Sequence, residues 1–274
     1  MKAVLAAAGI GSRLQPLTGC LPKCMVPIGG QPLLGIWLGM LAGAGIKDIL
    51  VNLHHHAGFV GEYLRRSPYA PIVRTVSEEA LVGTGGTLLR NKASLAGGPV
   101  FFAHADNLTC FDVAAFIAAH AARPPGTVMT MMTFETPTPR QCGIVELDAS
   151  GVVTAFHEKV ADPPGCLANA AVFILEPAVL DFLETVPAGR QTIDFSVDVL
   201  PHFLGRIFTY RNDTYHRDIG SIPSLVEAQF DYPLNRASFP VPAGDPWCGL
   251  MTESLIEDVT SAMRSALATL PAAR

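Results

Sequence analysis

The chain has 274 residues, of which 49% are hydrophobic and 16% charged, and its formal net charge is −5 at neutral pH. The length suffices for one large domain with an appendage, and the even spread of apolar residues excludes a disordered chain. The negative charge argues against general nucleic-acid binding, which usually needs a basic face. The longest later apolar stretch, residues 32–46, is shorter than a membrane span, so we expect no membrane partner.

The six cysteines form neither a C-x-x-C pair nor a dense cluster. This pattern favours reduced thiols over a disulfide framework. The apolar run in MKAVLAAAGIG is of minimal length and is followed at once by polar residues, which argues against a signal peptide. We therefore expect a cytoplasmic protein.

Strands and helices alternate through the first 122 residues. The hydrophobic periodicity predicts strands at 2–7, 48–53, 71–76 and 99–104, and helices at 32–45, 56–66, 85–95 and 112–122. This alternation indicates an α/β fold with a mainly parallel sheet covered by helices on both faces. Ligands of such sheets bind beyond the carboxyl ends of the strands.

The second half of the chain is richer in strands. We predict strands at 126–134, 143–148, 151–159, 167–176 and 206–211, with a hairpin turn at Ser150 and Gly151, and helices at 177–184, 193–203 and 221–230. A Pro-rich segment, 232–246, precedes a last helix at about 252–269.

These patterns divide the chain into a domain at 1–231, with halves 1–125 and 126–231, and a C-terminal segment at 232–274. The C-terminal segment could pack on its own subunit or on a neighbouring copy. The sequence therefore leaves open whether the protein is a monomer or a homo-oligomer.

A glycine-rich turn follows the first strand, in AAAGIGSRLQPLTGCLPKCMVPIGG. Gly9 and Gly11 carry no Cβ, so main-chain N–H groups there could approach an anion closely. A dinucleotide fingerprint would need a third glycine where Leu14 stands, and a P-loop would need a Gly-Lys-Ser/Thr triplet that the chain lacks. The turn therefore predicts a phosphate cradle of another type.

This stretch resembles the signature of the sugar nucleotidylyltransferases, which join a nucleoside triphosphate to a sugar 1-phosphate and release pyrophosphate. The family pattern is G-x-G-[ST]-R-L-x-P-L-T followed by P-K-x-x-x-P-[IV]. The matching residues are Gly9, Gly11, Ser12, Arg13, Leu14, Pro16, Leu17, Thr18, Pro22, Lys23, Pro27 and Ile28. The resemblance implies a Rossmann-like, three-layer αβα fold, with nucleotide bound by residues 1–125 and sugar phosphate by residues 126–231.

The resemblance implies that Arg13 and Lys23 are the catalytic residues. The planar fork of Arg13 suits the β and γ phosphates, and the point charge of Lys23 suits the α-phosphate. A second segment, SEEALVGTGGTL, resembles the family's E-x-x-P-L-G-T-x-G and has Leu81 where proline is usual. The implied nucleotide-binding residues are Ala8, Gly9, Gly11, Ser12, Arg13, Glu78, Gly83 and Thr84. A carboxylate at Glu78 suits the N–H groups of guanine.

Two aspartates match the metal ligands of the family. Asp106 lies in FFAHADNL, where Ala105 replaces the usual glycine, and Asp218 lies in YHRDIGSIPSL. The resemblance implies Mg²⁺ as cofactor, since this ion suits two carboxylates completed by phosphate oxygens and waters. The consecutive histidines at 54–56 point in different directions at a strand end, and we do not expect them to bind a metal.

The sugar phosphate is expected in the strand-rich half. QCGIVELDASGVVTAFHEK resembles the family's Y-G-x-V-x-x-D-x-x-G-x-V-x-x-F-x-E-K, with Cys142 in place of the tyrosine. The implied sugar-phosphate-binding residues are Gly143, Glu158, Lys159 and Asn169. The change at Cys142 leaves the identity of the sugar open.

The implied reaction is an in-line attack of the sugar phosphate on the α-phosphorus, with no covalent enzyme intermediate and no general base. We favour GTP with a manno-configured hexose or heptose 1-phosphate. An enzyme like N-acetylmuramate 1-phosphate uridylyltransferase or phosphocholine cytidylyltransferase is the alternative. A non-catalytic regulatory subunit is the alternative of another class, although retention of both metal carboxylates speaks against it.

Overall fold

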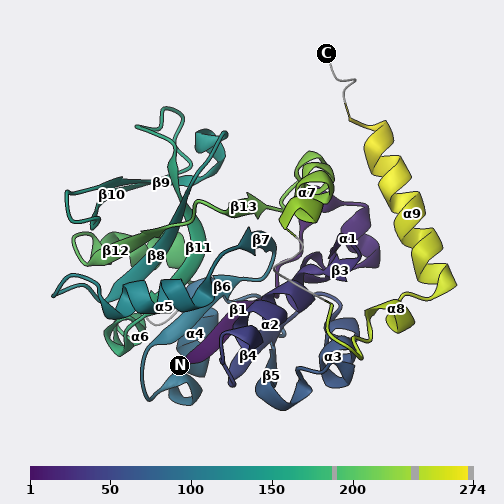
Figure 1. The fold of residues 1–274 in the computed structure, drawn as a ribbon, viewed down its shortest axis with the longest axis horizontal. Coiled ribbons are helices and arrows are strands. Elements are labelled where there is room, and N and C mark those ends of the chain that lie inside the picture. The colour runs from purple at the N-terminus through teal and green to yellow at the C-terminus, as the bar shows by residue number, and fades with distance from the viewer. Residues whose placement is uncertain (187–189, 236–240, 271–274) are drawn as a thin grey trace. The chain divides into compact units, whose positions relative to one another are not determined.

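The computed structural model of the chain describes residues 1–186, 190–235 and 241–270 (Figure 1). The chain divides into two compact units, each built from three stretches. The first unit comprises residues 1–6, 80–104 and 111–216, and the second comprises 7–79, 105–110 and 217 onwards. The predicted ligand-binding halves, 1–125 and 126–231, are each one continuous segment, whereas each compact unit combines three separate stretches. The predicted halves therefore stay a prediction about ligand binding.

The first unit is built around a mixed sheet. β1 (Lys2–Ala6) runs parallel to β6 (Val100–His104), with Ala3 opposite Phe101. β11 (Leu167–Leu175) pairs antiparallel with β6 through its second half. β6 therefore lies between β1, from the start of the chain, and β11.

The strands of the second half extend this sheet. β8 (Met129–Glu135) pairs antiparallel with β11 and parallel with β12 (Ile207–Arg211). β9 (Gly143–Leu147) and β10 (Val153–Glu158) form the expected hairpin, and β9 also pairs with β11. The predicted strand-rich texture of this region is confirmed.

The helices of the first unit are α4 (Gly83–Leu95), α5 (Val113–Ala121) and α6 (Pro177–Leu183). The helix predicted at 193–203 is wrong in form, because the chain there makes a π-helical turn at Phe195–Val199 and a 3-10 turn at Leu200–Phe203. Proline at position 201 lacks the backbone N–H that a continuous α-helix would need.

Three aromatic rings occupy the centre of the first unit. Phe102 lies 6.0 Å from Phe173 and 5.3 Å from Phe195, measured between ring centroids. Phe173 and Phe195 are 5.1 Å apart, and all three side chains are buried. Aromatic pairs at these distances stabilise a core beyond their buried area, so this cluster fixes the irregular turn at 195–199 against the sheet.

The second unit contains a parallel strand pair, β4 (Ile49–Leu53) and β5 (Val73–Ser77). It also contains the short hairpin β2 (Pro27–Ile28) and β3 (Gln31–Pro32) and the strand β7 (Asn107–Cys110). The strand β13 (Tyr215–Asp218) precedes the last part of this unit. The sequence did not predict β7 or β13, because both are four residues long.

The first helices of the second unit are α1 (Leu17–Cys20), α2 (Leu33–Gly43) and α3 (Ala57–Arg66). Helix α2 is buried on nearly every side, which agrees with its almost uniformly apolar sequence. Helix α3 is amphipathic, with Val60, Tyr63 and Leu64 buried and the basic residues of its last turn exposed.

Helix α7 (Ile222–Asn235) continues past the predicted end at residue 230. Tertiary packing accounts for the difference, because Tyr232 is fully buried. A Cβ atom at Gly29 would lie only 2.4 Å from the Tyr232 ring, so the glycine allows this contact. Of the predicted Pro-rich segment 232–246, residues 236–240 lie outside the described residues.

The C-terminal part contains α8 (Trp247–Leu250) and α9 (Glu253–Ala268), the latter close to its predicted bounds. Trp247 lies edge-on to Phe59 and Tyr63 of α3, and the Tyr63 hydroxyl donates to Asp245 Oδ2 at 3.0 Å. Helix α9 packs against α1, and its buried residues are Ala262 and Ala266 (Figure 1).

Helices accompany the strands in both units, and the prediction of an α/β fold is confirmed. Within residues 1–186, 190–235 and 241–270, no helix combines the length and the apolar character required to cross a bilayer.

Gly83 gives a test of the packing at the start of α4. An added Cβ would lie 2.3 Å from the Ile193 carbonyl oxygen, and the glycine has φ +77°. Gly205 has φ +78° with nothing within 4 Å of the added Cβ. We expect Gly83→Ala to lower the free energy of unfolding by about 3 kcal/mol or more, and Gly205→Ala by about 1 kcal/mol. Urea denaturation measures both, and equal losses would contradict the packing described.

Candidate functional site

The turn that follows β1 folds back on itself. Gly11 has φ +67°, and an added Cβ would lie 2.9 Å from Thr18 Cγ2 and 3.1 Å from Lys23 Cβ. The Thr18 hydroxyl donates to the Gly11 carbonyl at 2.8 Å. Glycine is therefore required at position 11 by the packing of the loop itself, a reason that the sequence did not reveal.

The other residues of the predicted phosphate cradle lie around this turn. Ala8 is buried, whereas Gly9, Ser12 and Arg13 are exposed. A Cβ added at Gly9 would lie 3.7 Å from Asp106 Oδ2, an ordinary contact. Residues 12–14 form a 3-10 turn that carries Arg13 on the surface.

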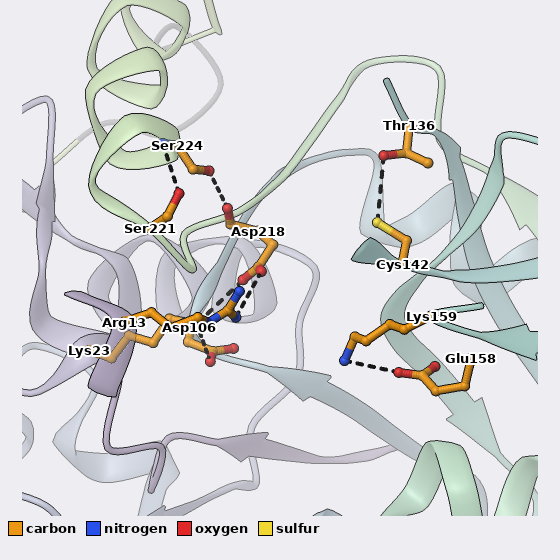
Figure 2. A network of polar contacts seen from close by, with 10 residues as sticks. All are labelled: Arg13, Lys23, Asp106, Thr136, Cys142, Glu158, Lys159, Asp218, Ser221 and Ser224. Carbon is orange, nitrogen blue, oxygen red and sulfur yellow. Dashed lines mark hydrogen bonds and ion pairs between the residues drawn. The ribbon is translucent and has the colours of Figure 1, made fainter. Parts of the chain in front are cut away.

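Lys23 lies at the centre of a charged cluster. Its Nζ is 2.7 Å from Asp106 Oδ2 and 3.4 Å from Asp218 Oδ1 (Figure 2). Asp106 follows β6, Asp218 ends β13, and Lys23 begins a 3-10 turn. The fold thus brings together three residues that are far apart in the sequence, as expected for a shared site.

The Lys23 side chain is only 8% exposed. Burial alone would lower the pKa of Lys23, but attraction to Asp106 and Asp218 outweighs this effect and raises the pKa above its ordinary value. Lys23 is therefore a fixed positive charge at neutral pH. It is not suited to donate a proton.

Arg13 approaches the same cluster from the solvent side. Its Nη2 lies 3.8 Å from Asp218 Oδ2, and its side chain is 69% exposed. A Cβ added at Gly220 would lie 2.8 Å from Arg13 Nη2, so the glycine leaves room for the guanidinium. An exposed ion pair of this length contributes little to stability, and the guanidinium remains accessible to a ligand.

The backbone beside Asp106 is anchored from α2. Trp37 is fully buried, and its Nε1 donates to the Asn107 carbonyl at 2.9 Å. Sequence reasoning missed this contact, since the partners are separated by 70 residues. The anchor limits how far the Asp106 carboxylate can move away from Lys23.

The two carboxylates fit a divalent cation as part of its ligand set. Both converge on one positive group, the Lys23 ammonium, and both supply the oxygen ligands that Mg²⁺ prefers. Among the described residues there is no group of three or more His, Cys, Asp or Glu side chains that could hold a metal. A cation here would therefore need further oxygen ligands from a phosphate or from water.

Glu78 belongs to a buried network in the same unit. Asn52 Nδ2 donates to Glu78 Oε1 at 3.0 Å, and Asn52 Oδ1 accepts from the Ala7 N–H at 2.7 Å. His54 and His55 each contact a backbone carbonyl, those of Glu78 and Thr18. The predicted contact of Glu78 with a nucleobase stays a prediction. Asn52 could have been noticed as the polar residue within the apolar strand ILVNL.

Gly83 and Thr84 lie in the other unit, where Gly83 packs closely on Ile193 and its two neighbours in the sequence bind the backbone of residues 193–195. The Val82 carbonyl accepts from the Ile193 N–H at 2.8 Å, and Thr84 Oγ1 accepts from the Phe195 N–H at 3.0 Å. These contacts dock residues 193–195 on the start of α4. The predicted role of Gly83 and Thr84 in nucleotide binding stays a prediction.

The predicted sugar-phosphate residues also lie in the first unit. Lys159 Nζ is 3.0 Å from Glu158 Oε1, and the Lys159 side chain is 63% exposed (Figure 2). Gly143 lies opposite Glu158, and an added Cβ would be 2.6 Å from both Glu158 Oε2 and Phe156 Cζ. Gly143 therefore lets the Glu158 side chain cross the hairpin.

Asn169 and Cys142 lie near this hairpin. Asn169 Oδ1 accepts from the Ala171 N–H at 2.9 Å, at a bulge where Ala171 has φ +54°. Cys142 Sγ lies 3.5 Å from Thr136 Oγ1. Asn169 thus stabilises its own strand, and its predicted contact with the sugar stays a prediction.

Comparisons with known proteins identify the family of the chain. The family model described as Nucleotidyl transferase matches residues 2–234. The mannose-1-phosphate guanylyltransferase of Mycobacterium tuberculosis is 31% identical over 246 residues, which cover 88% of this chain and 66% of the relative. The UTP–glucose-1-phosphate uridylyltransferase of Synechocystis is 28% identical, with 83% and 62% covered. The chain thus spans less than two thirds of the length of these relatives.

A solved structure shares the fold. It comes from Bacillus anthracis, is assigned as a glucose-1-phosphate thymidylyltransferase, and superposes with a TM-score of 0.76 at 18% identity. The superposition covers 84% of this chain and 94% of that chain. At this identity the likeness concerns the fold alone.

Cys24, next to Lys23, gives a test of how tightly the loop between Arg13 and Lys23 is packed. Burial raises the pKa of Cys24 to about 12, with Asp106 as a further cause. At pH 8 its thiol should therefore stay protonated and unreactive, whereas the exposed Cys248 should react. Iodoacetamide labelling of the folded protein followed by peptide mass spectrometry measures both. Equal labelling rates would contradict the closed loop.

Proposed function

The chain belongs to the nucleotidyl transferase family, and we propose from this and from the site that it is a sugar-1-phosphate nucleotidylyltransferase. The observation that carries the proposal is the buried Lys23 ammonium, in contact with the carboxylates of Asp106 and Asp218. Nucleotidyl transfer to the anionic oxygen of a sugar phosphate needs fixed positive charge at the reacting phosphate, and no general base. A cationic Lys23 supplies such a charge across neutral pH.

The proposed reaction is a single displacement. An oxygen of the sugar 1-phosphate forms a bond to the α-phosphorus, and the bond from that phosphorus to the β-bridging oxygen breaks. Pyrophosphate leaves with the electron pair of the broken bond. The attacking oxygen is already anionic at pH 7, so no proton has to be removed.

The residues have distinct roles in this proposal. Lys23 binds the α-phosphate, and the exposed fork of Arg13 binds the β and γ phosphates. Asp106 and Asp218 would hold Mg²⁺, which when bound neutralises phosphate charge. The Lys159 ammonium, exposed beside Glu158, would pair with the sugar phosphate.

For the substrates, we propose GTP and a manno-configured sugar 1-phosphate. The support is the 31% identity to a mannose-1-phosphate guanylyltransferase and the carboxylate at Glu78, which suits guanine. The uridylyltransferase relative at 28% identity favours UTP with glucose 1-phosphate as the second candidate.

Pyrophosphate release across a panel tests the proposal. The panel pairs GTP, UTP, CTP, ATP and dTTP with mannose 1-phosphate, glucose 1-phosphate, a heptose 1-phosphate and N-acetylmuramate 1-phosphate. We expect GTP with a manno-configured sugar to give the highest rate. Highest activity with UTP and glucose 1-phosphate would support a sugar-1-phosphate nucleotidylyltransferase but overturn GTP and a manno-configured sugar as its substrates. No release from any pair would favour a non-catalytic subunit.

Replacement of Lys23 tests its role in the reaction. We expect Lys23→Met to lower kcat by about 100-fold or more, because one positive group at the reacting phosphate is lost. Lys47→Met is the control, since Lys47 is exposed at the surface and has no part in the proposal. Circular dichroism checks that both variants fold. Undiminished turnover of Lys23→Met would refute the role of Lys23.

Binding of Mn²⁺ tests the carboxylates without turnover. In the absence of nucleotide, the Lys23 ammonium already offsets part of the negative charge of Asp106 and Asp218, so we expect weak binding to the unmodified protein. Lys23→Met should tighten Mn²⁺ binding by about fivefold or more, since the competing ammonium is removed. Adding Asp106→Asn should abolish this gain. Electron paramagnetic resonance of the unbound ion measures both, and a gain that survives Asp106→Asn would exclude Asp106 as a ligand.

A further inference from the structure

Helix α7 contacts both sides of the Lys23–Asp218 pair. It follows Asp218 closely in the sequence, and its later turns contact the segment that follows Lys23. The helix is therefore placed to determine the distance between the ammonium and the carboxylate.

On the Asp218 side, two contacts hold the backbone. The Ser224 hydroxyl donates to the Asp218 carbonyl oxygen (Figure 2). Arg217, the residue before Asp218, forms ion pairs with Glu227 and with Asp231, the latter at 2.8 Å between Nη2 and Oδ2. These two acidic residues lie one turn apart on α7, so the guanidinium lies along the helix and holds the end of β13 against it.

On the Lys23 side, two other contacts hold the hairpin that follows. Gln229 Nε2 donates to the Pro27 carbonyl at 2.7 Å, and Gln229 Oε1 accepts from the Gly29 N–H at 3.0 Å. Tyr232 packs on Gly29. Lys23 is linked to this hairpin by a single turn, in which the Val26 N–H donates to the Lys23 carbonyl at 3.1 Å.

We propose that Arg217 and Gln229 are positioning residues, which act through α7 to keep the Asp218 carboxylate within reach of the Lys23 ammonium. The inference rests on the proposed function, because it concerns the geometry of that reaction. Neither residue touches substrate in this account. The two terminal nitrogens of Arg217 pair with acidic residues of α7. The amide nitrogen and oxygen of Gln229 both bind the backbone of the hairpin.

Simple stabilisation of the fold is the competing explanation. Helix α7 already buries Ile222, Leu225, Ala228 and Tyr232, which anchor it independently of its polar residues. Arg217 is 27% exposed and Glu227 is 60% exposed, and ion pairs at this exposure contribute little to stability. Loss of Arg217 should therefore lower the melting temperature by no more than about 4 °C.

Kinetics of Arg217→Gln, Gln229→Ala and a matched control test the inference. The control is Arg74→Gln, because Arg74 also forms a 2.8 Å ion pair with an aspartate at a partly exposed site of the same unit. We expect Arg217→Gln and Gln229→Ala each to lower kcat by about 10- to 100-fold, as displaced reacting groups do. The KM for the sugar 1-phosphate should stay within about twofold. Arg217→Lys should recover most of the loss, since an ammonium can keep the pair with Asp231.

A binding measurement separates positioning from turnover. In protein that carries Lys23→Met, addition of Arg217→Gln should weaken Mn²⁺ binding by about fivefold or more, and addition of Arg74→Gln should not change it. If the folded Arg217→Gln protein matches Arg74→Gln in kcat and in Mn²⁺ affinity, the inference is wrong. If Arg217→Gln does not fold, Arg217 serves the stability of the protein and the inference is wrong for that residue. The kcat of Gln229→Ala then decides whether α7 has a positioning role.

Failure of the proposed function has a different signature. In that case the unmodified protein releases no pyrophosphate from any pair of nucleotide and sugar phosphate, and Lys23→Met binds no Mn²⁺. The positioning roles of Arg217 and Gln229 are then overturned together with the proposed function. An active unmodified protein with an unaffected Arg217→Gln variant overturns the inference alone.

Discussion

The buried ammonium of Lys23 is the interaction on which the site depends. A lysine that is 8% exposed would be strongly unfavourable without partners, and removal of either partner from such a pair costs far more than an exposed ion pair contributes. Asp106 and Asp218 come from chain segments about 80 and 200 residues away. The local structure of three loops must therefore be correct before Lys23 can be buried.

The surrounding structure meets this requirement through backbone contacts. Gly11 and Thr18 shape the loop that carries Lys23, Trp37 holds the backbone next to Asp106, and α7 holds the backbone at Asp218. Each of these three contacts is made to a main-chain carbonyl, whereas the charged side chains of Lys23, Asp106 and Asp218 pair with one another. In sites built on rigid elements, it is typical that one set of residues fixes the backbone and another set carries the charged groups.

The sequence predicted the order of the elements well, because strongly apolar stretches of period 2 or 3.6 dominate both units. It also predicted that Lys23, Asp106 and Asp218 would meet, since their motifs resemble those of a known family. It did not predict the partners of ordinary residues. The contacts between Asn52 and Glu78, Gly83 and Ile193, and Gly29 and Tyr232 depend on tertiary packing.

Two helices differ from their predicted form. The helix at 221–230 was predicted too short because the burial of Tyr232 cannot be read from local periodicity. The helix at 193–203 was predicted as regular, although a proline at 201 and packing around Phe195 make it irregular. The burial of Tyr232 and the packing of Phe195 depend on residues elsewhere in the chain, whereas Pro201 is a local signal within its own segment.

The packing of α9 on α1 has a practical consequence. Residues 253–268 lie beyond the region that the family model matches, yet they touch the loop between Arg13 and Lys23. A spectroscopic probe on the solvent side of α9 would sense rearrangement of that loop without altering Arg13 or Lys23. The C-terminal helix thus offers a place from which ligand binding could be observed in real time.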